Sequence, residues 1–177
     1  MSKIPITSMS TERMIFIGIG VFSIIILMGS YWFVSKPEKP LQGKETTSQG
    51  ATHVARGQSH SSYNSNPPTS GWHWGDGVAG PGIKDKQVPD ELVLHSMEHG
   101  AAVLWYRDSL QKAEVDKIKN AFNSSSGKKI MIPRKNLDVP VALTSWGRIL
   151  QLKTVDLAKI KEFIETNNDR APEKADI

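Results

Sequence analysis

The sequence predicts an α+β domain that follows one N-terminal transmembrane helix. The domain is expected to contain a small mixed or antiparallel sheet with two helices packed on it, preceded by a Gly/Pro-rich loop that carries histidines. Three observations support this fold. A long apolar run lies near the N-terminus, four short apolar stretches of strand length follow residue 100, and two stretches with helical spacing of apolar residues alternate with them.

The first 62 residues predict an anchor and a linker. After a short tail (residues 1–13), the uncharged run 14–34 is long enough, at about 1.5 Å per residue, to cross a hydrocarbon core of about 30 Å. Tyr31 and Trp32 at its end suit the membrane interface. A cleaved signal peptide would carry a shorter apolar region and small residues after it, so an uncleaved span in contact with membrane lipid is favoured. Residues 35–62 are rich in small and polar side chains and predict a flexible linker.

The globular domain is expected over residues 63–170, with a C-terminal tail at 171–177. A loop dense in Gly and Pro begins it. Asp90 should then cap a short helix that Gly100 ends. After it, the sequence predicts four strands, at residues 101–106, 129–132, 139–144 and 148–152. It also predicts two helices: one over residues 110–122, capped by Ser109, and one from 155 through Ile164, capped by Thr154.

Composition excludes several function classes. Lysine and arginine number 22 against 18 acidic residues, and the resulting charge of +4 is scattered along the chain, which excludes a nucleic-acid partner. Cysteine is absent, which excludes disulfides, thiolate metal ligands, iron–sulfur clusters and thiol nucleophiles. Gly75, Gly77 and Gly80 match the spacing of a dinucleotide-binding loop, but no strand precedes them and no helix follows them.

All five histidines precede residue 100, and the densest group is the segment from His95 to His99. If this segment is helical, the i, i+4 histidines point to one side, Glu98 shares their face, and one metal ion can be chelated. If it is extended, Met97 aligns with the two histidines and favours copper over zinc. The sequence leaves both arrangements open, together with a purely structural role in which the histidines pair with Glu98 and the backbone. His73 is the expected third ligand.

The spacing H-x-x-E-H also matches a class of zinc hydrolases in which the glutamate activates a zinc-bound water. Glu98 would then be the catalytic base. Because Gly100 ends the helix directly after His99, and no acidic third ligand stands at a recognisable spacing, the sequence favours a metal carrier over an enzyme. In a carrier Glu98 would only orient an imidazole, so Glu98→Gln is expected to retain most of the bound metal.

Four stretches are similar to one known family: YNSNPPTSGWHW (63–74), VPDELVLHSMEHGAAVLWY (88–106), VALTSWGR (141–148) and RAPE (170–173). They resemble the domain of unknown function 3105 family of bacteria and archaea. The resemblance implies an N-terminal membrane anchor, an extracytoplasmic domain and a recurring histidine set, which falls here on His53, His73, His95 and His99. The sequence departs from the usual family pattern at Trp72 and Trp74 around His73, and at Met97.

The sequence therefore predicts a single-pass protein of the cell membrane with an extracytoplasmic metal-binding domain, for copper ahead of zinc. His53, on the linker, is an optional fourth ligand, and Met97 is a candidate fifth. The competing interpretation is a non-catalytic accessory or interaction subunit of a membrane complex with structural histidines. A metal-dependent hydrolase is the third. The charges that flank the span are nearly balanced and do not orient it.

Overall fold

A computed structural model of the chain describes residues 10–35 and 38–177. They divide into two compact units on either side of the Lys39–Pro40 bond, and each unit is described by itself. The first unit contains α1 (Thr11–Val34), which begins where the Ser10 hydroxyl accepts a hydrogen bond from the Arg13 amide at 3.4 Å. Residues 1–9 of the predicted N-terminal tail lie outside the described residues.

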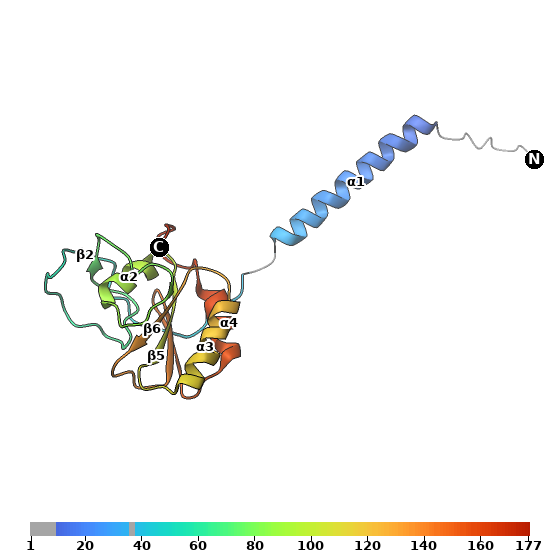
Figure 1. Cartoon of the computed structure of the whole chain (residues 1–177). Helices are drawn as coiled ribbons and strands as arrows, with labels where there is room; N and C mark the ends of the chain where they lie inside the picture. Colours follow the sequence, from blue (N-terminus) through green and yellow to red (C-terminus); the bar gives the residue numbers. More distant parts are fainter. Residues whose placement is uncertain (1–9, 36–37) are drawn as a thin grey trace, which may run out of the picture. The chain divides into compact units, whose positions relative to one another are not determined.

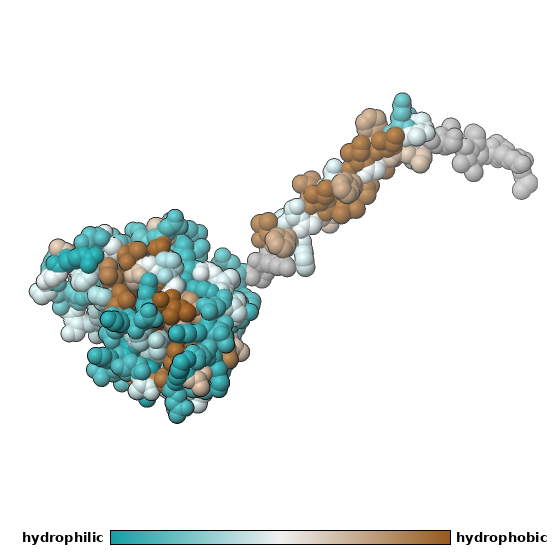
Figure 2. Space-filling model, in the orientation of Figure 1, coloured by the Kyte–Doolittle hydropathy of each residue, from teal (hydrophilic) through white to brown (hydrophobic). Residues whose placement is uncertain are grey.

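The helix α1 buries none of its side chains within the protein, and its surface is mostly hydrophobic along its length (Figure 2). It is long and apolar enough to cross a membrane. A signal sequence near an N-terminus meets the same criteria, so length and composition alone make α1 a candidate span.

The second unit has a six-stranded mixed sheet in the order β1-β8-β7-β5-β6-β4, which confirms the predicted α+β class. The strands β4, β6 and β5 run parallel to one another, and the remaining pairs are antiparallel. A separate parallel pair is formed by β2 and β3. The strands are β1 (Lys44–Glu45), β2 (His53–Val54), β3 (His73–Trp74), β4 (Gly82–Ile83), β5 (Ala102–Arg107), β6 (Lys129–Arg134), β7 (Val141–Ser145) and β8 (Arg148–Leu152).

Three helices cover the sheet: α2 (Asp90–Glu98), α3 (Lys112–Ser124) and α4 (Leu157–Asn167). Figure 1 shows α3 and α4 together on one side of the central strands and α2 on the other. The strand β5 explains the layering, because Ala102 and Leu104 pack with α3 and α4 while Val103 and Trp105 pack with α2. Its apolar run is continuous because both faces of the strand are buried.

The helix starts differ from the predicted ones. Asp156, not Thr154, caps α4, since its carboxylate accepts the Lys159 amide at 3.1 Å. No side chain caps α3, where Ser109 was expected to do so. Asp90 is the first residue of α2 rather than its cap. Its carboxylate instead accepts two hydrogen bonds from Arg134, at 2.6 and 2.9 Å.

The segments that the sequence predicts to be a flexible linker and a C-terminal tail are part of the folded unit, the linker from Pro40 onward. The expected linker 35–62 contributes β1 and β2, and the Gly50 carbonyl accepts the Gly71 amide at 2.8 Å. In the expected C-terminal tail, the Glu173 amide donates to the Glu98 carbonyl at 3.1 Å, and Ile177 packs against the core on the α2 side. The folded unit therefore runs from Pro40 to Ile177.

Candidate metal centre

The helix α2 places three polar side chains on one face. His95, Glu98 and His99 stand at positions i, i+3 and i+4, which adjoin on a helix surface. The segment is helical, so the extended alternative is wrong. The helix ends at Glu98, with His99 as its C-cap: Gly100 has φ +96°, its amide donates to the Met97 carbonyl at 3.0 Å, and the Ala101 amide donates to the Ser96 carbonyl at 2.9 Å. This is a Schellman ending, which requires the positive φ that glycine adopts freely.

The short parallel pair β2–β3 supplies the other two imidazoles. His53 and His73 are register partners, so their side chains leave the same face of the pair side by side, with ring centroids 4.7 Å apart. The His73 amide donates to the Thr52 carbonyl at 3.1 Å and holds this register. His73 is fully buried, whereas the His53 side chain is 48% exposed. Pairing of two segments that are distant in sequence thus brings His53 to the site, although it was expected on a flexible linker.

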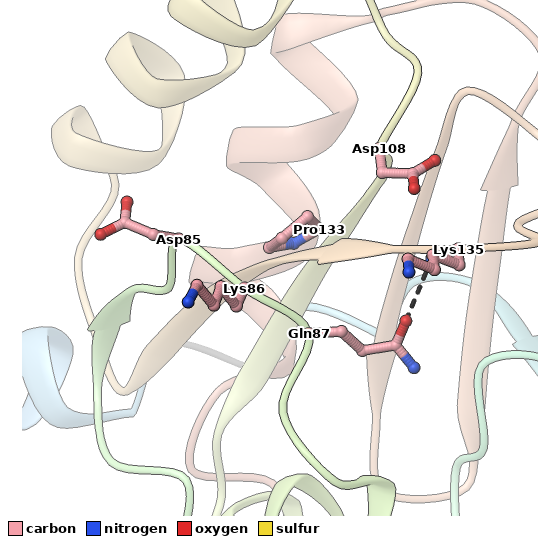
Figure 3. Close-up of a pocket in the computed structure, with 6 residues that line it drawn as sticks. All are labelled: Asp85, Lys86, Gln87, Asp108, Pro133 and Lys135. Carbon is pink, nitrogen blue, oxygen red and sulfur yellow. Dashed lines mark hydrogen bonds between the residues drawn. The ribbon is translucent and has the colours of Figure 1, made fainter.

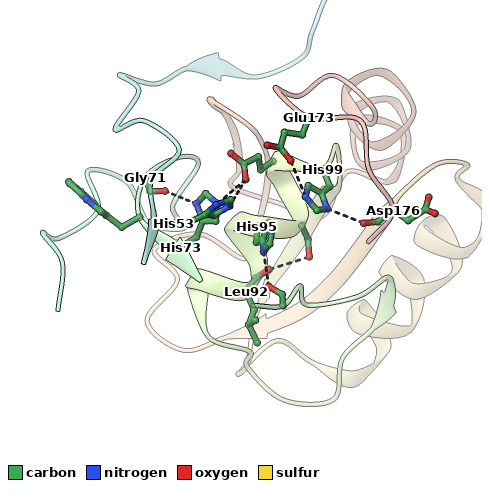
Figure 4. Close-up of polar contacts among 12 residues, drawn as sticks. His53, Gly71, His73, Leu92, His95, His99, Glu173 and Asp176 are labelled. Atoms are coloured by element: carbon green, nitrogen blue, oxygen red, sulfur yellow. Dashed lines mark hydrogen bonds and ion pairs between the residues drawn. The ribbon is translucent and has the colours of Figure 1, made fainter. Parts of the chain in front are cut away.

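The Glu98 carboxylate lies between the two sets of histidines. Its Oε2 is 2.9 Å from Nε2 of His73 and 3.2 Å from Nε2 of His53, and the residue is only 3% exposed. Two groups of ligand atoms share this carboxylate, and within each group the atoms lie within 4.8 Å of one another: His53, His73 and Glu98, and His95, Glu98 and His99. Figure 4 shows the imidazoles of β2, β3 and α2 converging in this region. The sequence analysis expected Glu98 only to orient one imidazole, whereas the structure places its carboxylate among the candidate ligand atoms of both groups.

Backbone carbonyls orient three of the four imidazoles. The Nδ1 atoms of His73, His95 and His99 lie 2.8, 2.8 and 2.9 Å from carbonyl oxygens of Gly71, Gly77 and Asp176. A carbonyl only accepts, so each Nδ1 donates its proton, and in the neutral ring the lone pair is then on Nε2. Metal-ligating histidines are commonly held in this way, because the donated hydrogen bond fixes both the tautomer and the ring orientation.

The surroundings of His95 favour its neutral form. Burial lowers the pKa of His95. The hydrogen bond to the Gly77 carbonyl acts in the opposite direction, and the neighbouring His99, His73 and His53 lower the pKa further. A neutral imidazole is the form that binds a metal ion, so protons compete less at His95 than at a free histidine.

Met97 does not join these side chains. It is fully buried in the core on the α2 side, and its sulfur accepts a hydrogen bond from the Thr144 hydroxyl at 3.2 Å. The helical geometry explains this placement, because a residue two positions from both His95 and His99 projects to a different side of the helix.

His60 also lies apart from the two ligand groups. Its ring contacts the Ser61 carbonyl at 2.9 Å and the Glu91 carboxylate at 3.2 Å, and it stacks on Trp72. The backbone contact and Glu91 raise the pKa of His60, although its partial burial acts in the opposite direction.

One acidic side chain near the site lies in the expected C-terminal tail. Glu173 Oε2 is 3.4 Å from Nε2 of His99, beside the Asp176 carbonyl that holds Nδ1 of the same ring. Glu173 closes the RAPE stretch, which the sequence singled out only for its family resemblance.

A surface pocket elsewhere offers no comparable chemistry. It is lined by Asp85, Lys86, Gln87, Asp108, Pro133 and Lys135 (Figure 3). It has no histidine, and its two lysines offset its two aspartates, which disfavours a bound cation. The histidine centre is therefore the stronger functional candidate in the described part of the chain.

Comparison with known proteins gives one match. A family model described as "Protein of unknown function (DUF3105)" matches residues 53–176, which include all four histidines of the centre, Glu98 and Glu173. No curated protein and no solved structure matches this chain.

Proposed function

Since the chain belongs to the DUF3105 family, whose description assigns no activity, we propose a function from the centre itself: a membrane-anchored, extracytoplasmic protein that binds a metal ion, copper ahead of zinc. The ligands are His53, His73, His95 and His99 together with Glu98. Met97 is left out because its sulfur lies in the core.

The observation that carries this proposal is the contact between His73 and Glu98. Nδ1 of His73 donates to a carbonyl, so Nε2 of the neutral ring is an acceptor, yet it lies 2.9 Å from a carboxylate oxygen. Two acceptors at this distance repel each other unless a proton or a cation joins them. His53 contacts the same oxygen, and the nearby His95 favours its neutral form. A metal ion satisfies several such lone pairs at once, without a separate proton on each buried ring.

The donor set favours copper. Imidazole nitrogen and carboxylate oxygen bind both copper and zinc, and for a given site of this kind Cu²⁺ binds more tightly than Zn²⁺. His73, fully buried, is the fixed ligand, and the half-exposed His53 is the ligand that an incoming ion meets from solvent.

The location of the domain is the second part of the proposal. The helix α1 serves as an uncleaved single span in contact with lipid, since its apolar run is longer than that of a signal peptide and bulky aromatic residues follow it. The domain after it lies outside the cytoplasm, as the family resemblance implies.

Metal binding is tested on the full chain in detergent after removal of metal. Equilibrium dialysis against Cu²⁺ or Zn²⁺, followed by elemental analysis, should find bound metal in the wild type. We expect the His95→Ala/His99→Ala variant to bind less metal than the wild type, because it loses two of the four imidazole ligands. The His60→Ala variant is the matched control and should bind normally. Equal binding by wild type and double variant, or none by either, would overturn the proposal.

The alternative function is an accessory subunit whose histidines only stabilise the fold. It is favoured by the close contacts of His73 with Glu98, at 2.9 Å, and of His99 with Glu173, at 3.4 Å. Thermal unfolding separates the two functions. A specifically bound ion at 100 times its dissociation constant stabilises the fold by about 2.7 kcal/mol, whereas a structural cluster gains nothing from added metal.

A hydrolase is less well supported. Its Glu98 would have to face a metal-bound water, whereas Oε2 of Glu98 is already in contact with two imidazoles.

A further inference from the structure

We infer that the centre holds two metal ions, bridged by the carboxylate of Glu98. This inference rests on the proposed function, but it goes further, because a carrier of a single ion needs neither the bridge nor all four histidines.

The ligand atoms fall into two groups with one member in common. One group takes His53 and His73 from the β2–β3 pair, and the other takes His95 and His99 from the last turn of α2. Glu98 belongs to both groups. Its contacts with the first pair use Oε2, and a carboxylate has a second oxygen, Oε1, for the second pair.

Each group is compact enough for an ion of its own. Ring centroids are 4.7 Å apart within the first pair of histidines and 4.6 Å apart within the second. Each ion then has two imidazole nitrogens and one carboxylate oxygen, with positions left for water. Two ions joined in this way stand about 3.5–4 Å apart in proteins, a span that one carboxylate bridges.

A single ion would leave part of the cluster unused. Among the described rings, His99 contacts only that of His95, while His53 and His73 contact each other and His95. His99 therefore stands at one end of the row of rings, with Nδ1 fixed by the Asp176 carbonyl in the same manner as the buried ligands. An ion placed between His53 and His73 does not explain this second oriented pair.

Two acidic side chains at the centre offset part of the charge of two cations. Glu98, buried between the groups, carries the negative charge that reduces repulsion between the ions. Glu173 lies 3.4 Å from His99 Nε2 and adds a second negative charge on the side of the α2 pair. The half-exposed His53 leaves the other side open to water.

The number of ions per chain tests the inference. Metal-free full chain in detergent is dialysed against Cu²⁺ or, separately, Zn²⁺, and bound metal is measured by elemental analysis. We expect two ions per chain in the wild type and in His60→Ala. One ion is expected in His53→Ala/His73→Ala and one in His95→Ala/His99→Ala. One ion in the wild type overturns the bridge and leaves the proposed function standing, whereas none overturns both.

A second measurement can be made on the wild type alone, with the double variants as a comparison. Two Cu²⁺ ions bridged by a carboxylate interact magnetically, so the electron paramagnetic resonance signal of the loaded wild type should integrate to fewer spins than the copper present. In each double variant, the number of spins should equal the number of bound copper ions. Two copper ions with full spin intensity in the wild type would show separate sites and overturn the bridge.

Discussion

At the scale of single residues, the centre depends on which atom of each imidazole faces inward. Carbonyl oxygens of Gly71, Gly77 and Asp176 engage three Nδ1 atoms, so the lone pair of each neutral ring is on Nε2, and Nε2 of His73 lies against Glu98. These carbonyls belong to loops and to the C-terminal segment, not to a strand or helix that presents the ring. These three residues therefore take part in the site through their backbone carbonyls.

His60 provides a pH prediction that is independent of the metal. Contacts with Ser61 and Glu91 raise its pKa, so the folded protein favours the charged ring. Its contribution to stability is full below the unfolded pKa of about 6.5 and is lost as pH rises through the raised folded value. In His60→Gln, the loss of the charged ring should lower the free energy of unfolding by less than about 1 kcal/mol at pH 5.5, as for a partly exposed ion pair, and this pH-dependent part of the loss should vanish near pH 9.

Urea unfolding of wild type and His60→Gln at the two pH values measures this difference. Bound metal should be the same in both proteins at either pH. A cost that stays constant or grows from pH 5.5 to pH 9 would contradict the prediction.

The sequence predicted the α2 ligands because helical spacing alone puts His95, Glu98 and His99 on one face. It could not predict how His53 reaches them, since the β2–β3 register joins segments 20 positions apart through two residues each. It misplaced Met97 for a related reason: the extended alternative was open until the surrounding packing selected a helix.

At the scale of elements, apolar patterns predicted the strands of the core, but they did not predict the segment that polar contacts hold in place. The strand β5 was predicted within one residue at each end, because a buried strand carries its own continuous apolar signal. The strand β8, which is mostly half-buried, was predicted at its observed bounds. Residues 40–62 are folded through polar contacts, such as the Thr46 and Thr69 hydroxyls at 2.6 Å and the Gln49 amide to the Ser70 hydroxyl at 2.9 Å. Such contacts give no periodic pattern, so their segment was predicted to be a linker.

The end of α2 provides a prediction about backbone conformation. A Cβ at residue 100 would lie 2.9 Å from the Asp169 Cα, in a residue whose φ is +96°. Gly100→Ala therefore combines a backbone penalty of about 1–2 kcal/mol with a steric one of about 1–3 kcal/mol. Gly147→Ala is the matched control, because φ is +70° there but nothing lies within 4 Å of the added carbon.

Urea unfolding should show that Gly100→Ala loses at least about 1 kcal/mol more stability than Gly147→Ala. Equal losses would mean that the contact with Asp169 relaxes without cost.

At the scale of the whole molecule, the chain joins a helix that buries nothing to a domain that has its own core. The helix α1 contributes no buried side chain, and both apolar clusters lie within the unit Pro40–Ile177. The domain therefore has what a folded domain requires without α1, and a membrane is the environment that matches the apolar surface of the helix.

The proposed topology gives a protease prediction. Protease added to intact spheroplasts should degrade the domain and leave a small fragment that contains α1. Lysis before protease treatment should not change the result, and a cytoplasmic marker protein should be cut only after lysis. Full protection of the domain in intact spheroplasts would place it in the cytoplasm.

The pairing of β2 with β3 also affects how the centre comes into being. In the unfolded chain only His95 and His99 are near each other, and an isolated helix of nine residues is marginal in water. His53 and His73 reach them only after two loops have closed, each at an entropic cost. The complete ligand set therefore exists only in the native ensemble, and an ion that joins β3 to α2 would act as a reversible cross-link between segments that few backbone hydrogen bonds hold together.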